Sequence, residues 1–112
     1  MIRGIGVDIV EIDRIRKLLA DTAFLSRFFT EAEQAFLKRP ESVAANYAAK
    51  EAYAKALGTG IRGFSLKDIE VLRDGAGKPY IRTYANAKTE GRVHVSLSHE
   101  KTHAIAYVIV EE

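Results

Sequence analysis

"NYAAKEAYAKALGTG", residues 46–60, is the stretch that decides the fold of this chain. Its alanines predict a narrow helix over about residues 42–57, and the glycines after it supply the signal that ends the helix. A narrow helix lets its backbone approach a neighbouring element closely. Glu51 stands four residues from both Tyr47 and Lys55, so the three side chains share one helical face. This spacing fits either an exposed Glu51–Lys55 pair or a carboxylate directed at a metal ion, with Lys55 beside it for a phosphate.

The N-terminal stretch RGIGVDIV alternates in the manner of a β-strand. Asp8 shares one face with two glycines that would allow another element to come close, and the other face holds Ile5, Val7 and Ile9. The pattern changes to helical spacing in EIDRIRKLLA, so Asp8 is predicted at a strand-to-helix junction. An aspartate there either caps the helix or serves as a metal ligand. Glu11 and Asp13 are nearby competitors for both roles.

The remaining elements predict an α+β fold with an antiparallel sheet. Thr30 and Glu33 have the spacing of a capping box at a helix start, and DIEVLRD, GAGKP and YIRTY are typical of a hairpin. RVHVSLSH alternates, and a turn after it leads into the apolar strand HAIAYVIV. We expect one apolar face of this region to need a partner chain, namely the face of Val93, Val95 and Leu97.

Length and composition fit one globular domain, which we expect to span residues 1–112. Apolar residues make up 47% and charged residues 29% of the chain, which argues against disorder. The absence of cysteine excludes disulfides and thiolate metal sites and suits the cytoplasm. The N-terminus lacks the apolar core of a signal peptide, and the longest apolar run, AIAYVIV, is too short to span a membrane.

Three histidines, His94, His99 and His103, lie close together near the C-terminus. Their spacing does not fit a zinc site on one strand, so a histidine hydrogen-bonded to the backbone is the ordinary alternative. His99 is the best functional candidate because it follows the polar face of Ser96 and Ser98. The glycine-rich GTGIRG indicates a helix end and a turn, although its backbone N–H groups would also suit a phosphate.

Basic residues gather on and after the first predicted helix, at Arg14, Arg16, Lys17 and Arg27. Such a surface is either solvated or a docking site for an acidic partner. One alternative function is a small basic nucleic-acid-binding domain that places these side chains on phosphates. The 15 acidic residues and the lack of an aromatic-basic RNA motif argue against it. Another alternative is a non-enzymatic subunit whose charged helices are merely solvated.

Across nearly its full length the chain resembles the holo-acyl-carrier-protein synthase group of 4′-phosphopantetheinyl transferases. The matching segments are GIGVDIVEIDRI, FTEAE, AAKEAYAKALGTG, DIEVLRDGAGKPY and VHVSLSH. Their most specific combination is a Gly-x-Asp motif ending at Asp8 and a Lys-Glu-Ala motif about forty residues later. The resemblance implies a long helix and shorter helices packed on the sheet. It also implies transfer of the 4′-phosphopantetheine arm of coenzyme A to a serine of apo-acyl carrier protein in fatty acid biosynthesis, with release of adenosine 3′,5′-bisphosphate.

The resemblance also implies roles for particular residues. Asp8 and Glu51 are expected to bind Mg²⁺, or Mn²⁺ in its place, together with the pyrophosphate of coenzyme A. Lys55 is the third expected catalytic residue, because it lies on the Glu51 face. Contacts to coenzyme A are expected from Lys50, Lys55, Gly58, Gly77, Lys78, Pro79, Ser96 and His99.

The family further implies a homotrimer whose active sites lie between neighbouring subunits. A long first helix with basic residues is expected to dock the acidic carrier protein, chiefly through Arg14, with Arg16, Lys17 and Arg27 as helpers. Neither nucleic acid nor a membrane is expected as a partner.

Overall fold

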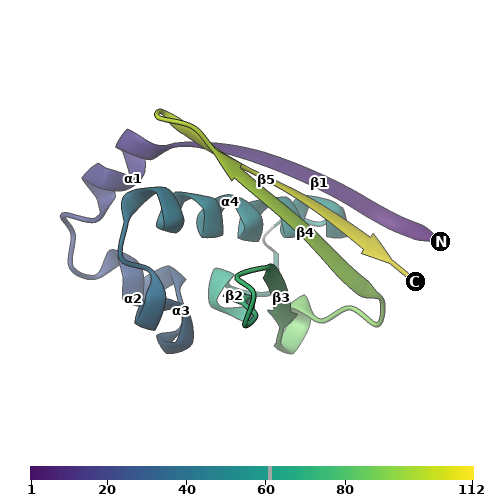
Figure 1. Ribbon diagram of the computed structural model, residues 1–112. Coiled ribbons are helices and arrows are strands. Elements are labelled where there is room, and N and C mark those ends of the chain that lie inside the picture. Colours follow the sequence, from purple (N-terminus) through teal and green to yellow (C-terminus); the bar gives the residue numbers. More distant parts are fainter. Residues whose placement is uncertain (61) are drawn as a thin grey trace.

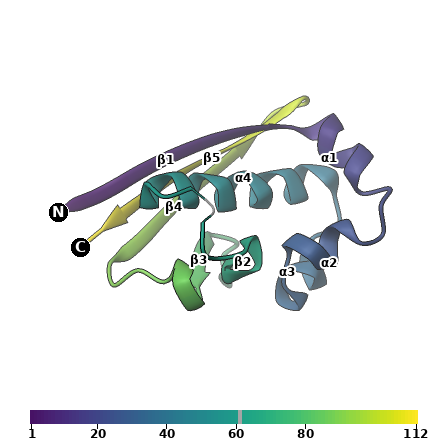
Figure 2. The same ribbon diagram turned by 180° about the vertical axis from the view of Figure 1, so that it is seen from behind.

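The computed structural model describes residues 1–60 and 62–112. Its elements form three layers, with a sheet on one side, helix α4 in the middle, and a hairpin and short helices on the other side (Figure 1). Figure 2 shows the same order from behind. The helices are α1 (Ile12–Leu18), α2 (Phe24–Phe28), α3 (Glu31–Phe36) and α4 (Pro40–Leu57), with short 3₁₀ turns η1 (Leu66–Asp68) and η2 (Ala85–Ala87). The strands are β1 (Ile2–Glu11), β2 (Ile69–Arg73), β3 (Pro79–Thr83), β4 (Arg92–His99) and β5 (His103–Glu111).

The strands form two antiparallel sheets, which confirms the α+β prediction. The larger sheet has the order β1-β5-β4, and the smaller one is the predicted hairpin of β2 and β3. Asp8 lies opposite Ala106, which lies opposite Leu97 on the next strand. Because β1 pairs with β5, the two chain ends lie side by side in both views (Figures 1 and 2).

Helix α4 is buried on almost all sides because it lies between the two other layers. Its alanines allow a very close approach to β1. A Cβ atom added to Gly4 would lie 1.9 Å from the carbonyl oxygen of Ala56, and one added to Gly6 would lie 1.9 Å from that of Ala52. The glycines of β1 and the alanines of α4 are therefore two halves of one backbone contact, as the sequence indicates.

A buried polar network fastens the lower layer to α4. The Lys50 ammonium lies 2.6 Å from a Glu33 carboxylate oxygen and also donates to the carbonyls of Phe28 and Leu66. Glu33 also accepts from the backbone N–H of Val71, and both charged side chains are fully buried. Two such charges tolerate burial only when each is fully hydrogen-bonded. Among the described residues, no buried side-chain polar atom lacks a partner.

The outer face of the large sheet is apolar and uncovered in the single chain. Its side chains are between 40% and 62% exposed and come from Ile5, Val7, Ile9, Ile105 and Tyr107. The predicted face of Val93, Val95 and Leu97 is instead half-buried against the core. That prediction is wrong because α4 covers the inner side of β4, so the unpartnered face of the sheet is the opposite one. A contiguous apolar surface of this kind marks an interaction site.

The helices near the N-terminus are shorter than predicted. Helix α1 ends at Leu18 after 7 residues, so the expectation of a long first helix is wrong. The long helix is α4, with 18 residues. The predicted capping box is confirmed, with Thr30 accepting from the Glu33 backbone N–H and Glu33 accepting from that of Thr30. No helix among residues 1–60 and 62–112 combines the length and apolarity needed to cross a membrane.

Gly6→Ala should destabilise the fold by about 1–3 kcal/mol or more, because the new methyl group must force β1 away from α4. Gly75→Ala is the matched control, since a Cβ at Gly75 meets nothing within 4 Å. Urea unfolding of the two variants measures the difference. Equal midpoints for Gly6→Ala and the unmodified chain would show that the strand and helix are not in close contact.

Candidate functional site

The β1–α4 contact brings the two predicted carboxylates together. Asp8 lies inside β1, on the half-buried inner face, and not at a helix start. The residue that precedes α1 is Glu11, which makes no side-chain cap, so the alternative of Asp8 as a helix cap is wrong. The Lys55 ammonium lies 3.2 Å from an Asp8 carboxylate oxygen and 3.0 Å from the Val7 carbonyl oxygen. Within the described residues Lys55 forms its ion pair with Asp8 and not with Glu51. The alternative of an exposed Glu51–Lys55 pair is therefore wrong.

Glu51 is held in an environment that disfavours its charge. Partial burial raises the pKa of the Glu51 carboxyl, and the negative charge of Asp8 raises it further. Hydrogen bonding with Tyr47 and the charges of Lys55 and Arg14 act in the opposite direction and are weaker. A carboxyl group that a neighbouring carboxylate disfavours in its charged form makes, together with that neighbour, a site that a cation would stabilise.

The donor set fits a hard divalent cation that keeps part of its shell for other ligands. Among the described residues, no group of three or more histidine, cysteine, aspartate or glutamate side chains could hold a metal. Asp8 and Glu51 therefore offer two carboxylates and no complete protein cage. Mg²⁺ is commonly bound in this way, by one or two carboxylates with water and substrate phosphates. Mn²⁺ accepts the same oxygen ligands.

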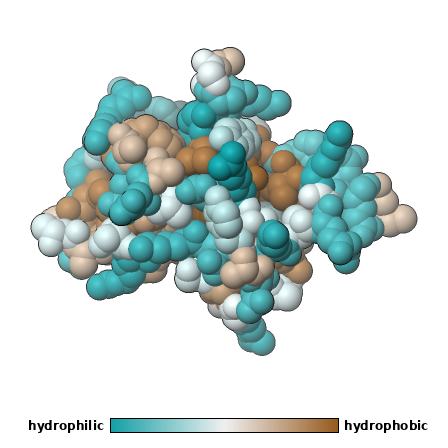
Figure 3. Space-filling view, turned by 90° about the horizontal axis from the view of Figure 1, so that it is seen from below, coloured by the Kyte–Doolittle hydropathy of each residue, from teal (hydrophilic) through white to brown (hydrophobic). Residues whose placement is uncertain are grey.

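A second concave site lies between β4, the N-terminal part of α4 and the β2–β3 turn. This cleft has a volume of about 420 Å³. Eleven residues line it, and they include five of those predicted to contact coenzyme A, namely Gly77, Lys78, Pro79, Ser96 and His99. On the lower face of the molecule, polar side chains project around recessed hydrophobic residues (Figure 3). The predicted residues of the β2–β3 turn and those of β4 are remote in sequence, and the fold brings them to the same cleft.

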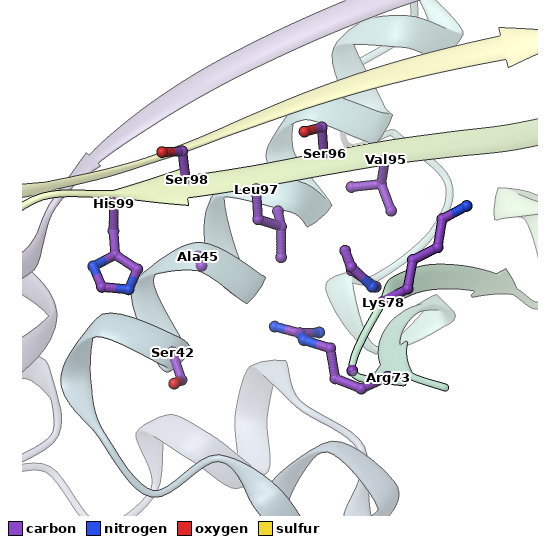
Figure 4. Close-up of a pocket in the computed structure, with 11 residues that line it drawn as sticks. Ser42, Ala45, Arg73, Lys78, Val95, Ser96, Leu97, Ser98 and His99 are labelled. Atoms are coloured by element: carbon purple, nitrogen blue, oxygen red, sulfur yellow. The ribbon is translucent and has the colours of Figure 1, made fainter. Parts of the chain in front are cut away.

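The side chains around the cleft do not all point into it. His99 hangs from β4 toward Ser42 of α4, whereas the hydroxyls of Ser96 and Ser98 project from the other side of the strand (Figure 4). His99 follows the polar face of Ser96 and Ser98 along the chain, as predicted, but its side chain lies on the opposite side of β4 from the two hydroxyls (Figure 4). Strand alternation places Ser96 opposite Tyr107 on the outer face. Ser96 borders the cleft, but its hydroxyl is not directed into it.

Arg73 is a cleft residue that the sequence analysis missed. Its guanidinium reaches from the end of β2 into the space below Leu97 and Ala45 (Figure 4). The available signal was a cation at the end of a strand directly before the turn that carries Gly77 and Lys78. The sequence could not show that this side chain turns toward β4 and α4.

The carboxylates and the cleft lie on opposite sides of α4. Glu51 and Ser42 are nine positions apart, which is about two and a half helical turns and places them on opposing faces. Asp8 faces the helix from β1, whereas Ser42 and Ala45 line the cleft beneath β4. Within one chain, the buried helix α4 separates the two groups of predicted site residues.

Lys50 cannot serve as a ligand for coenzyme A in this structure. Its ammonium is completely buried and donates to Glu33, Phe28 and Leu66. Burial lowers the pKa of Lys50, and the nearby Glu33 carboxylate opposes this effect. The predicted contact is wrong because Lys50 points to the lower layer, away from both Asp8 and the cleft.

Gly58 ends α4 in the left-handed conformation, with φ of 78°, as the sequence predicts for a helix C-cap. The predicted phosphate-binding segment GTGIRG includes residue 61, which lies outside the described residues. His94 faces Glu111 on the neighbouring strand at 2.9 Å, and His103 lies 3.5 Å from Glu100. These two histidines thus take part in surface pairs away from the cleft.

The basic residues around α1 are all exposed, as predicted. Arg16 is paired with Asp13 and lies 4.0 Å from Glu41, while Arg27 lies over the ring of Phe28. The charge of Arg14 lowers the pKa of Glu51, so Arg14 lies near enough to that carboxyl to act on it. The exposed cationic surface therefore adjoins the Asp8–Glu51 site.

Replacing Glu51 with glutamine should raise the unfolding free energy at pH 7 by up to about 1 kcal/mol in the absence of divalent cations, since the half-exposed charge is partly screened. A folded-state pKa above the unfolded value costs stability as the pH rises through both values. The gain should therefore vanish below about pH 4, where both states are protonated. Denaturant unfolding of Glu51→Gln and of the unmodified chain between pH 4 and pH 7 measures this gain in unfolding free energy. Glu90→Gln, at an exposed position, is the control. A gain that is independent of pH would contradict the unfavourable Asp8–Glu51 interaction.

Comparison with known proteins identifies the family. The sequence model of the 4′-phosphopantetheinyl transferase superfamily matches residues 4–108. The chain is 49% identical to a holo-[acyl-carrier-protein] synthase of Clostridium perfringens, with 99% of this chain and 95% of the relative aligned. An Alkaliphilus oremlandii protein of the same name is 46% identical, over 97% and 98% of the two chains.

Solved structures agree with the sequence matches. A Bacillus anthracis holo-(acyl-carrier-protein) synthase in complex with CoA (3′,5′-ADP) superposes with a TM-score of 0.88 at 47% identity, covering 99% of this chain and 97% of that one. A Helicobacter pylori synthase in complex with coenzyme A gives 0.88 at 33% identity, covering 96% and 99%. With the fold, the motifs and these matches in agreement, the chain belongs to the 4′-phosphopantetheinyl transferase superfamily and groups with its holo-[acyl-carrier-protein] synthases.

Proposed function

We propose that this chain transfers the 4′-phosphopantetheine arm of coenzyme A to a serine of apo-acyl carrier protein, in a Mg²⁺-dependent reaction that serves fatty acid biosynthesis. The observation that supports this most is the pair Asp8 and Glu51, brought together beside Lys55 in a transferase of this family. Residues 1–112 would act as one domain, and the cytoplasm is the compartment that suits the two substrates. The proposal replaces the alternatives of a small basic nucleic-acid-binding domain and a non-enzymatic subunit.

The reaction forms one bond and breaks one bond at phosphorus. The serine oxygen bonds to the phosphorus that carries the pantetheine arm, and the bond from that phosphorus to the bridging oxygen breaks. The leaving group is adenosine 3′,5′-bisphosphate, and the serine releases its proton. Such a transfer requires negative charge to be neutralised while the attacking and leaving oxygens stay in line.

The residues of this chain suit these needs. Asp8 and Glu51 would hold Mg²⁺ against the pyrophosphate, and the bound ion would supply positive charge for the phosphate oxygens. Lys55 already reaches Asp8 across the strand–helix contact. Its flexible, exposed ammonium is free to turn toward a phosphate once the ion neutralises Asp8.

We also propose that each active site combines two chains of a homotrimer. In one chain, α4 separates the carboxylates from the cleft, so one coenzyme A molecule would meet both groups most directly across a subunit boundary. The exposed apolar face of the large sheet supplies a surface for such an assembly. The pyrophosphate would then lie on the Asp8–Glu51 site of one chain, and the nucleotide in the cleft of its neighbour.

Calorimetry of coenzyme A with and without Mg²⁺ tests the proposed function. The unmodified chain should bind coenzyme A more tightly with Mg²⁺. Glu51→Gln, which is nearly isosteric, should lose both this gain and the transfer reaction, because one of only two protein ligands has lost its charge. Full Mg²⁺-dependent transfer by Glu51→Gln would contradict the metal site. Absence of coenzyme A binding by the unmodified chain would contradict the function itself.

Mixing two inactive variants tests the shared active site. Glu51→Gln and a Lys78→Ala/His99→Ala chain, refolded together, should recover about a quarter of the activity of the unmodified enzyme. In random trimers that fraction of interfaces combines intact carboxylates with an intact cleft. Each variant alone is the control. No recovery, a fully active cleft variant, or an active monomer by sedimentation would contradict the arrangement.

We propose that the exposed cations around α1 dock the acidic carrier protein, with Arg14 in the leading role and Arg16, Lys17 and Arg27 assisting. Arg14→Glu should raise KM for the carrier protein about tenfold or more, and much more than KM for coenzyme A, because like charges repel at the docking surface. Lys67→Glu, an exposed charge reversal on η1, is the matched control. Equal increases in both KM values would count against this docking surface.

A further inference from the structure

Tyr47 stands one helical turn before Glu51 in α4, so the two side chains lie on the same face of the helix. Side chains of a helix lean toward its N-terminus, which directs the Glu51 carboxylate over the turn that carries Tyr47. The Tyr47 hydroxyl forms a hydrogen bond with that carboxylate. Lys55, one turn further along, is instead paired with Asp8. Tyr47 is therefore the neighbour on α4 that can hold the Glu51 carboxylate in one orientation.

Two phenylalanines of α2 pack against the ring of Tyr47. The ring centroid of Tyr47 lies 6.3 Å from that of Phe24 and 6.3 Å from that of Phe28. The Phe28 ring meets it edge-on, at 85°, and Phe24 is buried in the core. Aromatic pairs at such separations contribute favourably to packing. Because these contacts hold the ring, they also set where its hydroxyl lies beside Glu51.

The Tyr47 hydroxyl is the donor in this hydrogen bond. Burial raises the pKa of the hydroxyl, and the charge of Glu51 raises it further. The hydroxyl therefore keeps its hydrogen at neutral pH, so the ionised carboxylate accepts. In return, the hydrogen bond lowers the pKa of Glu51, against the effects of burial and of Asp8. Tyr47 thus favours the charged form of Glu51 that a cation requires.

A single donated hydrogen divides the two oxygens of the Glu51 carboxylate. One oxygen is occupied by the Tyr47 hydroxyl, and the other is left for a cation. Mg²⁺ is small and demands near-octahedral geometry, whereas the larger Ca²⁺ readily takes both oxygens of one carboxylate. A carboxylate held in this way therefore suits Mg²⁺ better than Ca²⁺.

We propose that Tyr47 is a positioning residue, which holds Glu51 so that it binds an ion through one oxygen and thereby makes the Asp8–Glu51 site select Mg²⁺ over Ca²⁺. This inference rests on the proposed function, in which the two carboxylates bind the ion together with coenzyme A. The hydroxyl acts through Glu51 and does not itself contact the ion.

Calorimetric titration of the chain, saturated with coenzyme A, by Mg²⁺ and separately by Ca²⁺ tests the proposal. Tyr47→Phe removes one oxygen and keeps the ring that packs on α2. The dissociation constant for Mg²⁺ should rise about tenfold or more, as is usual when a group that orients a metal ligand is lost. The constant for Ca²⁺ should change much less, because the freed oxygen can join the larger ion. The preference for Mg²⁺ over Ca²⁺ should therefore fall about tenfold.

The ratio of the two dissociation constants separates this role from other effects of the substitution. Loss of the hydrogen bond also raises the pKa of Glu51, but a proton competes alike with both cations and leaves the ratio unchanged. Partial unfolding would likewise weaken both. Tyr84→Phe is the matched control, since the Tyr84 hydroxyl donates to the Glu70 carboxylate at 3.0 Å, in the layer on the other side of α4 (Figure 1). It removes an equivalent bond and should keep the preference for Mg²⁺.

An unchanged ratio in Tyr47→Phe, or an equal fall in Tyr84→Phe, overturns the selection by Tyr47 while the proposed function stands. Equal affinities of the unmodified chain for Mg²⁺ and Ca²⁺ would do the same. If coenzyme A binds and neither cation binds the complex, the metal site of the proposed function is overturned together with this inference.

Discussion

The approach of β1 to α4 is the contact on which the other features of this protein depend. Gly4 and Gly6 leave no space for a methyl group between the strand and the carbonyl oxygens of Ala52 and Ala56. This closeness puts Asp8, the next inward residue of β1, within reach of α4. It also turns the isoleucines and valine of β1 outward, because strand residues alternate between faces. The carboxylate pair and the apolar outer face therefore follow from one packing constraint.

The lower side of α4 is fixed by polar contacts and not by close backbone packing. Lys50 and Glu33 form a buried pair that joins α4 to α3 and, through the Val71 backbone, to the hairpin. Asn46 extends this network to Arg73 at the edge of the cleft. Because buried polar groups need particular partners, the network sets where the hairpin lies relative to α4. The shape of the cleft depends on that placement.

Periodicity predicted the elements well but not the relations between them. The Asn46–Gly60 stretch indicated a narrow helix beside a glycine-faced strand, and both are present. The pattern could not show that α4 is covered on both sides. Lys50 was therefore predicted to contact coenzyme A although it is buried, and the exposed face of the large sheet was predicted on the wrong side. Helix α1 ends two residues before the end of the helical pattern EIDRIRKLLA, because the turn after it has no strong signal in the sequence. Arg73 was missed because its direction depends on Asn46 and Phe36, which are remote in sequence.

Diffraction from crystals of the chain with coenzyme A and Mn²⁺, recorded at the manganese absorption edge, would locate the ion directly. The account predicts one anomalous peak at each active site, with carboxylate oxygens of both Asp8 and Glu51 and the pyrophosphate as its ligands. Bound coenzyme A with no anomalous peak there, or with the ion held by other side chains, would contradict the account.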